Sequence, residues 1–271
     1  MDETTHSGHA WRTADGRLVR VYDDTAALSE AAATLVAGVL REAVAARGLA
    51  TLCLAGGSTP RALHERLAAV HRGDVPWART TVVFGDERCV PPEHEASNYG
   101  MARDTLLSRV PVPAERVHRI RGELAPADAA DDYDRTLRRA LGGAPPDARA
   151  AAALDAPLLD VTILGVGADG HTASLFPGDP ALDERERWAV AVTAPAYVAE
   201  PRARVTLTLP LLRASRLVLV LVAGATKRDA VQAALGDEAT VPAGLVRAVG
   251  RTLWMVDEDA AGIASDVERR T

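Results

Sequence analysis

The sequence has few of the features that mark membrane or secreted proteins. Its longest unbroken aliphatic run, Leu217–Ala223, has seven residues, whereas a helix needs roughly 20 to span a bilayer. Only two cysteines are present, Cys53 and Cys89; they are too few for a disulfide framework and are not arranged as zinc ligands. The first residues, MDETTHSGHAWR, are polar and acidic and lack the basic start and apolar stretch of a secretory signal. We therefore expect a cytoplasmic protein without membrane partners.

An excess of positive charge is also missing. Lys and Arg number 31 against 37 Asp and Glu, which gives a formal net charge of −6, and no Lys/Arg-rich block interrupts the chain. A surface for nucleic acid would have to work against this overall field, so we expect no nucleic-acid partner. An anionic small substrate stays possible if a few cations converge in one pocket.

Short apolar runs alternate with amphipathic segments along most of the chain. Residues 24–47 predict a helix, because Leu28, Ala32, Leu35 and Val39 recur at helical spacing and Gly48 follows as a stop. Further helices are predicted at 61–71 and 228–235, and buried strands at 49–55, 80–84, 160–164, 217–223 and 252–256. Continuous aliphatic strands between helices predict an α/β fold, with a doubly wound, mainly parallel sheet covered by helices on both faces.

The same pattern favours one domain. Residues 1–23 are interpreted as an N-terminal tail and first strand region, and residues 24–271 as a single α/β domain. The Pro/Ala/Gly-rich segment 142–157 is expected to be a surface connection, since neither side of it has enough strands for a sheet of its own. The number of subunits stays open between a monomer and a small homo-oligomer.

Four predicted strands end in loops that carry polar or glycine-rich sequence. These loops are GGSTP (56–60), GDER (85–88), GVGADGH (165–171) and GATK (224–227). Because ligands of open parallel sheets bind at the carboxyl ends of the strands, we expect the four loops to share one edge.

The GGSTP loop has the composition of an anion site. Gly56 and Gly57 permit a tight turn and close approach of a ligand, while Ser58 and Thr59 offer hydroxyls. The free amides at the start of the following helix would bind an anion such as phosphate. The alternative is an ordinary strand-to-helix turn with a Ser/Thr cap.

The loop 165–171 also fits G-x-G-x-x-G, which is typical of dinucleotide sites. That fingerprint should open a helix, but here His171 and TASLFPGDP follow, in which Pro177 and Pro180 would end a helix early. A general base is the preferred interpretation: His171 can accept a proton near neutral pH, and Asp169 can orient it. The alternative is a histidine that only caps the turn.

Charged residues near the other loops are candidates for substrate binding. Asp86 and Arg88 follow one strand, Arg204 precedes an alternating strand predicted at 205–209, and Lys227 lies where a strand turns into a helix. Arginine binds phosphate or carboxylate with two parallel hydrogen bonds, and a lysine at a helix start fits a bound anion. The alternatives are a surface ion pair in GDER and solvated charges at Arg204 and Lys227. Residues expected to have surface, packing or capping roles are His6, His9, His64, His71, His94, His118, Cys53, Cys89, Ser97 and Asn98.

Taken in order, these stretches resemble the 6-phosphogluconolactonase family, within the glucosamine-6-phosphate isomerase/6-phosphogluconolactonase superfamily. The matching stretches are LAGGSTPRALHERL (54–67), FGDERCVPPEHEASNYGMARDTLL (84–107), LDVTILGVGADGHTASLFPG (159–178), RVTLTLP (204–210) and VAGATKRDAV (222–231).

The resemblance implies hydrolysis of 6-phospho-D-glucono-1,5-lactone to 6-phosphogluconate, in the oxidative pentose phosphate pathway, without a metal or cofactor. Carried over to this sequence, it implies that His171 is the general base and Asp169 its partner. The GGST loop, Arg204 and Lys227 would bind the phosphate. Asp86 and Arg88 would line the sugar end of the pocket, and Arg88 would also share the phosphate. The substrate-binding residues are Gly56, Gly57, Ser58, Thr59, Asp86, Arg88, Arg204 and Lys227.

Two other functions fit parts of the same pattern. Glucosamine-6-phosphate deaminases share the GGST loop, the DGH turn and the late lysine, but typically continue with IAFNEP where this sequence has TASLFP. A sugar-phosphate-sensing domain without catalysis would need a DNA-binding segment, and residues 1–23 are too few and too acidic for a helix-turn-helix.

Overall fold

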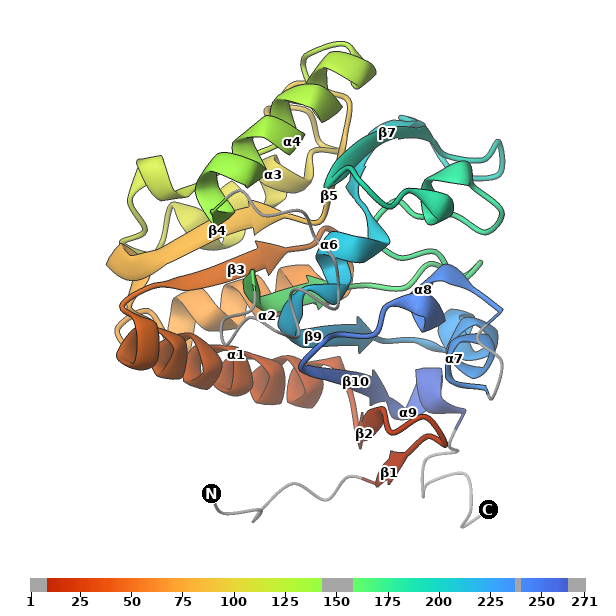
Figure 1. Cartoon of the computed structure of the whole chain (residues 1–271). Coiled ribbons are helices and arrows are strands. Elements are labelled where there is room, and N and C mark those ends of the chain that lie inside the picture. Colours follow the sequence, from red (N-terminus) through yellow and green to blue (C-terminus); the bar gives the residue numbers. More distant parts are fainter. Residues whose placement is uncertain (1–8, 143–157, 237–239, 263–271) are drawn as a thin grey trace, which may run out of the picture.

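The computed structural model describes residues 9–142, 158–236 and 240–262, and a seven-stranded sheet runs through its centre (Figure 1). The strands lie in the order β1-β2-β10-β9-β6-β3-β4, and all neighbours are parallel except β1 and β2. The prediction of a mainly parallel sheet is therefore confirmed. The strands are β1 (Ala10–Arg12), β2 (Leu18–Tyr22), β3 (Ala50–Leu54), β4 (Thr80–Phe84), β6 (Leu159–Leu164), β9 (Ser215–Val222) and β10 (Arg251–Asp257).

The central strands are continuous apolar runs because both faces of the sheet are covered. Every residue of β6 is buried, and so is every residue of β9 except Arg216. In Figure 1 the arrowheads of β3, β9 and β10 point to the same side of the molecule. The loops that follow these strands therefore meet at one edge.

The longest helix shows how local sequence sets the helix ends. Helix α1 (Thr25–Arg47) begins after Asp24, whose carboxylate accepts a hydrogen bond from the Ala27 amide, and it ends at Gly48 in a left-handed conformation. It packs against α2 (Ser58–Val70) and against β3 and β6. The other helices are η1 (Trp77–Arg79), α3 (Asn98–Ala102), η2 (Arg103–Leu107), η3 (Ala114–Arg116), α4 (Pro126–Leu141), η4 (Pro180–Asp183), α6 (Leu209–Arg213), η5 (Ala225–Lys227), α7 (Arg228–Leu235), α8 (Pro242–Leu245) and α9 (Glu258–Ala261).

A second, antiparallel sheet lies beside the first and was not predicted. It consists of β5 (Asp86–Arg88), β8 (Ala203–Leu207) and β7 (Ala189–Thr193), in the order β5-β8-β7, and α4 packs against β7 and β8. The strand predicted at 205–209 begins earlier and ends at Leu207, because Leu209 already starts α6. Thr206 is fully buried, and its polar hydroxyl is satisfied there because it accepts a hydrogen bond from the Ser174 amide.

The N-terminal segment contributes to the central sheet. Strand β2 hydrogen-bonds to β10 in parallel register, with Val19 opposite Trp254, and both residues are fully buried. Of the predicted connection 142–157, Gly142 ends α4 and the remainder lies outside the described residues. No helix within the described ranges is long and apolar enough to cross a membrane.

Candidate functional site

A cavity of about 220 Å³ lies at the carboxyl ends of β3, β4, β6 and β9. The chain passes from β3 outward to β4, and then from β6 in the other direction to β9 and β10. Such a reversal of strand order is the usual place for a ligand in an open α/β sheet. The walls are Ala55–Pro60, Asp86, Arg88, Asn98, Gly165–Gly167, His171, Ala173, Leu221–Ala223 and Lys227.

The start of α2 forms one wall of this cavity. Gly57 is the N-cap and makes no side-chain capping bond, so Ser58 and Thr59 are the first two helical residues rather than caps. The first amides of a helix have no partner within the helix, and the helix dipole gives them a partial positive charge. This wall therefore has the properties of an anion site.

His171 lies on the opposing loop and is held by Asp169. Its Nδ1 is 2.5 Å from Oδ1 of Asp169, which also accepts the His171 backbone amide at 3.2 Å. Since Nδ1 faces a carboxylate, we assign the proton to Nδ1, which leaves Nε2 as the nitrogen able to accept a proton. Burial disfavours the Asp169 carboxylate, but His171 and the Tyr197 hydroxyl outweigh it, so the pKa of Asp169 lies below its ordinary value.

The glycine-rich turn fits the His–Asp pair rather than a dinucleotide. A Cβ at Gly167 would lie 2.1 Å from Nδ1 of His171 and 2.6 Å from Oδ1 of Asp169, so only glycine fits there. The Gly167 amide donates to the His171 carbonyl and closes the turn. No helix begins between residues 165 and 179, all of which are described, so the G-x-G-x-x-G match lacks the helix that a dinucleotide site requires.

Asp86 is a buried wall residue whose two oxygens are both occupied. Oδ1 accepts the Asn98 side-chain amide at 3.0 Å, and Oδ2 accepts the Ser174 hydroxyl at 2.6 Å. Next to it, Glu87 accepts the amides of Arg88 and Asn98, and burial nevertheless raises the pKa of Glu87. These bonds make the GDER loop a rigid support for the cavity.

Two of the three predicted cations line the cavity, Arg88 and Lys227. Arg204 is only 6% exposed and lies opposite Arg88 in the β5–β8 ladder, outside the cavity wall. Burial, and secondarily the charge of Arg88, lowers the pKa of Arg204. Nε of each arginine is buried without a hydrogen-bond partner among the described residues, so this pair has unused donor capacity.

Eight of the ten predicted site residues thus line one cavity, and Asp169 contacts it through His171. The exception is Arg204, which lies opposite Arg88 in the β5–β8 ladder and is not part of the cavity wall. Asn98 was predicted only as a helix cap, yet it lines the cavity and holds Asp86. Ser174 and Tyr197 were not predicted at all, and both bind a site carboxylate. No group of three potential metal ligands occurs in the described part of the chain.

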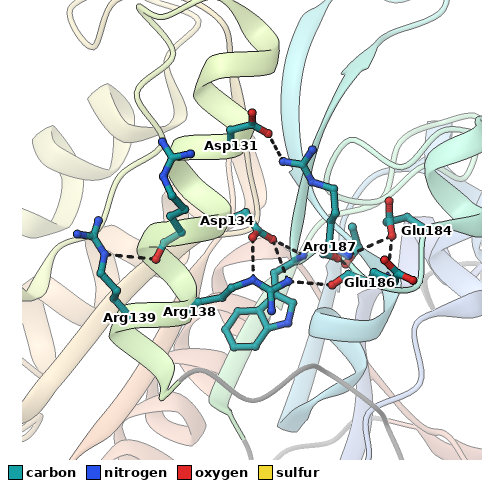
Figure 2. Close-up of polar contacts among 10 residues, drawn as sticks. Asp131, Asp134, Arg138, Arg139, Glu184, Glu186 and Arg187 are labelled. Atoms are coloured by element: carbon teal, nitrogen blue, oxygen red, sulfur yellow. Dashed lines mark hydrogen bonds and ion pairs between the residues drawn. The ribbon is translucent and has the colours of Figure 1, made fainter.

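A more open hollow of about 680 Å³ lies between η4 and β7. Four carboxylates and one guanidinium line it, so an anionic substrate would be repelled there. Figure 2 shows the neighbouring contacts: Arg187 pairs with Asp131, and Asp134 pairs with Arg138 at 2.8 Å. The first pair joins α4 to the segment before β7, and the second lies within α4. The carboxylates in the hollow are Asp179, Asp183, Glu184 and Glu186.

The chain is similar to proteins of one family over most of its length. The model of the family described as glucosamine-6-phosphate isomerases/6-phosphogluconolactonase matches residues 23–254. A 6-phosphogluconolactonase from Homo sapiens is 40% identical over 250 residues, 90% of this chain and 92% of the human protein. One from Mycobacterium tuberculosis is 40% identical over 254 residues, covering 90% and 96%.

A crystal structure of 6-phosphogluconolactonase from Thermotoga maritima superposes with a TM-score of 0.73 at 28% identity, covering 88% of this chain and 98% of the other. The family model covers most of the chain, and the two relatives are matched over nearly their full length. The chain therefore belongs to the glucosamine-6-phosphate isomerase/6-phosphogluconolactonase family.

Proposed function

We propose that this protein hydrolyses 6-phospho-D-glucono-1,5-lactone to 6-phosphogluconate, with His171 as general base. The observation that carries the proposal is the placement of His171 and the α2 N-terminus on one cavity, with Nδ1 of His171 engaged by Asp169. The relatives named above are 6-phosphogluconolactonases, which supports the same reaction.

The chemistry needs a base and a positioned water but no covalent nucleophile. A lactone is an ester, so water can add to C1 directly while Nε2 of His171 takes the proton. The bond between C1 and the ring oxygen then breaks, and the protonated His171 returns its proton to that oxygen, which becomes the hydroxyl on C5. The negative charge that develops on the carbonyl oxygen needs nearby donors. The amides of Gly167 and Gly170 already donate hydrogen bonds within the turn. In this proposal the amides of the wall residues Gly165 and Val166 donate to the carbonyl oxygen instead.

The phosphate lies at the other end of the cavity in this proposal. The amides of Ser58 and Thr59 and the ammonium group of Lys227 would bind it, and Arg88 would lie between phosphate and ring. Arg204 lies opposite Arg88 in the β5–β8 ladder and outside the cavity wall, so it contributes positive charge near Arg88 rather than a direct contact in this proposal. Anchoring the phosphate orients the lactone carbonyl toward the base.

A coupled assay that generates the lactone in place and follows 6-phosphogluconate formation tests this function. We expect the protein to exceed spontaneous hydrolysis, and His171→Ala to lower kcat by on the order of 10²-fold or more. His9→Ala is the matched control, because His9 is exposed and lies outside the cavity wall. A rate for His171→Ala equal to that of the unmodified protein would contradict the base assignment.

The family also contains glucosamine-6-phosphate isomerases. Incubation with glucosamine 6-phosphate therefore belongs in the same experiment. Ammonia release without lactone hydrolysis would replace our proposal with the deaminase reaction.

A further inference from the structure

The loop between β7 and β8, residues 194–202, reaches the His–Asp pair from outside the cavity. Its base is closed by the Ala194 amide, which donates to the Arg202 carbonyl at 2.8 Å. Its tip turns at Pro195, whose carbonyl accepts the Val198 amide at 2.9 Å. Tyr197 lies in this turn.

The Tyr197 hydroxyl completes the hydrogen bonding of Asp169. It donates to Oδ2 at 2.8 Å, while Oδ1 receives the amide and Nδ1 of His171. The His171 bonds are local, two residues apart in the chain. The Tyr197 bond spans 28 residues and ties the carboxylate to a different part of the fold.

The same loop also supports the imidazole ring. Val198 packs against a small apolar cluster of Phe176, Val192 and Ala194. The Phe176 ring lies 4.7 Å from the His171 ring, tilted by 44°. One loop therefore contacts both members of the pair, Asp169 through a hydrogen bond and His171 through Phe176.

Packing alone gives no reason for the position of Tyr197. It is 67% exposed, more than any other large hydrophobic residue in the part of the chain that the structure describes. The hydrogen bond to Asp169 raises the pKa of the Tyr197 phenol and contributes to the lowered pKa of Asp169. The hydroxyl is thus the part of Tyr197 with a specific partner.

We infer that Tyr197 is a positioning residue for lactone hydrolysis: its hydroxyl holds Asp169 in the orientation that keeps His171 ready to accept a proton. The inference rests on the proposed function and adds a residue of the β7–β8 loop to the site. Without the hydroxyl, Asp169 has one donor fewer and can rotate away from Nδ1.

Kinetics of Tyr197→Phe test the inference, since this change removes only the hydroxyl. We expect kcat to fall about 5- to 20-fold, at the lower end of the scale of one hydrogen bond to a charged group. KM should stay within about twofold, because Tyr197 does not line the cavity where substrate binds. The melting temperature should be unchanged, because the side chain is largely exposed.

Tyr99→Phe is the matched control, since Tyr99 is a second partly exposed tyrosine outside the cavity wall. It should leave kcat and KM unchanged. A Tyr197→Phe enzyme with unaltered kcat would overturn the inference, and so would a change confined to KM, which would place the loop in substrate binding instead.

A titration of the phenols tests the contact without any activity. Asp169→Asn should lower the pH at which one of the four tyrosines ionises, as followed by ultraviolet absorbance. The shifted tyrosine should be missing in Tyr197→Phe. If the protein did not hydrolyse the lactone but this shift appeared, the proposed function would fail while the contact stood; no shift would remove the contact itself.

Discussion

Gly167 lies so close to the His171 ring that no side chain fits at position 167. A methyl group there would overlap both Nδ1 of His171 and Oδ1 of Asp169. We expect Gly167→Ala to displace the ring and to lower kcat by on the order of 10²-fold, comparable to loss of the base itself.

Steady-state kinetics and circular dichroism together check this prediction. Gly73→Ala is the control, because no atom lies within 4 Å of the added methyl and Gly73 is outside the cavity wall. The fold should be retained in both variants. Equal kcat values for the two would show that the turn adapts and that His171 does not need this geometry.

At the residue scale, the sequence predicted which residues carry the chemistry, but it did not predict most of the side-chain contacts that hold them. His171 and Asp169 are two residues apart, so their pairing follows from local spacing. Asn98 and Ser174 meet Asp86 across 12 and 88 residues, and such side-chain contacts between loops leave no periodic signal. Arg204 was predicted to bind phosphate, but the antiparallel ladder that places it opposite Arg88 was itself not predicted.

Among the elements, the turn that carries Lys227 is held by a residue far along the chain. Asp257, at the end of β10, accepts the Gly224 amide with both carboxylate oxygens, each at 3.0 Å. Oδ1 also accepts the Ala260 amide and so caps α9. One buried carboxylate therefore fixes both the start of η5 and the start of α9.

Asp257→Ala should loosen this turn and with it the ammonium group of Lys227. We expect KM to rise about 3- to 10-fold with little change in kcat, because phosphate anchoring is weakened and the base is untouched. Lys227→Ala should change KM in the same direction. Loss of the cap should also cost about 1 kcal/mol of unfolding free energy in Asp257→Ala.

Asp257→Asn is the matched control for this element. Its Oδ1 can still cap α9 and accept the Gly224 amide, so KM should stay near that of the unmodified protein. If Asp257→Ala left KM unchanged while Lys227→Ala raised it, the turn would keep its shape without the carboxylate.

Elements with strong local signals were predicted closely, and short or irregular ones were not. Strand β4 and helix α7 have the predicted bounds, because a continuous apolar run and an amphipathic segment mark them. Helix α2 starts at Ser58 rather than at residue 61, since Gly57 takes the cap position and Pro60 is tolerated in the first turn. Strand β5 has only three residues, too few for a recognisable period.

At the scale of the whole molecule, a buried histidine links stability to pH. His64 in α2 is fully buried, with Nδ1 3.5 Å from the Thr105 hydroxyl and no partner for Nε2 among the described residues. Burial, assisted by the charge of Arg61, lowers the pKa of His64 to about 3.

As pH falls, the unfolded chain should therefore bind a proton at His64 at a higher pH than the folded protein does. An exposed histidine has a pKa of about 6.5, so between pH 6.5 and 3 protonation favours unfolding. The unfolding free energy should fall by about 1.4 kcal/mol per pH unit in this window, or about 2 kcal/mol at pH 5. Above pH 6.5 this effect should be absent.

Denaturant unfolding between pH 7.5 and 5 measures the slope, with His64→Leu as the comparison. The variant should lose most of the pH dependence. In the remainder, His118, whose pKa burial lowers, acts in the same direction as His64, and Glu87, whose pKa burial raises, opposes it. The carboxylates of Asp15 and Glu123, with pKa values of about 2, act only at lower pH. Identical slopes in both proteins would show that His64 is solvated in the folded state.

The residues that line the cavity are spread along the chain from 55 to 227. Strand β6 lies between β3 and β9 and so connects the two sides of the cavity. During synthesis, the GGST loop leaves the ribosome before β9 and the turn that carries Lys227, so the proposed phosphate site lacks its ammonium group until that turn has emerged. A nascent or C-terminally truncated chain that stops before Lys227 therefore has no complete binding site, and every active molecule is one whose synthesis has passed that point.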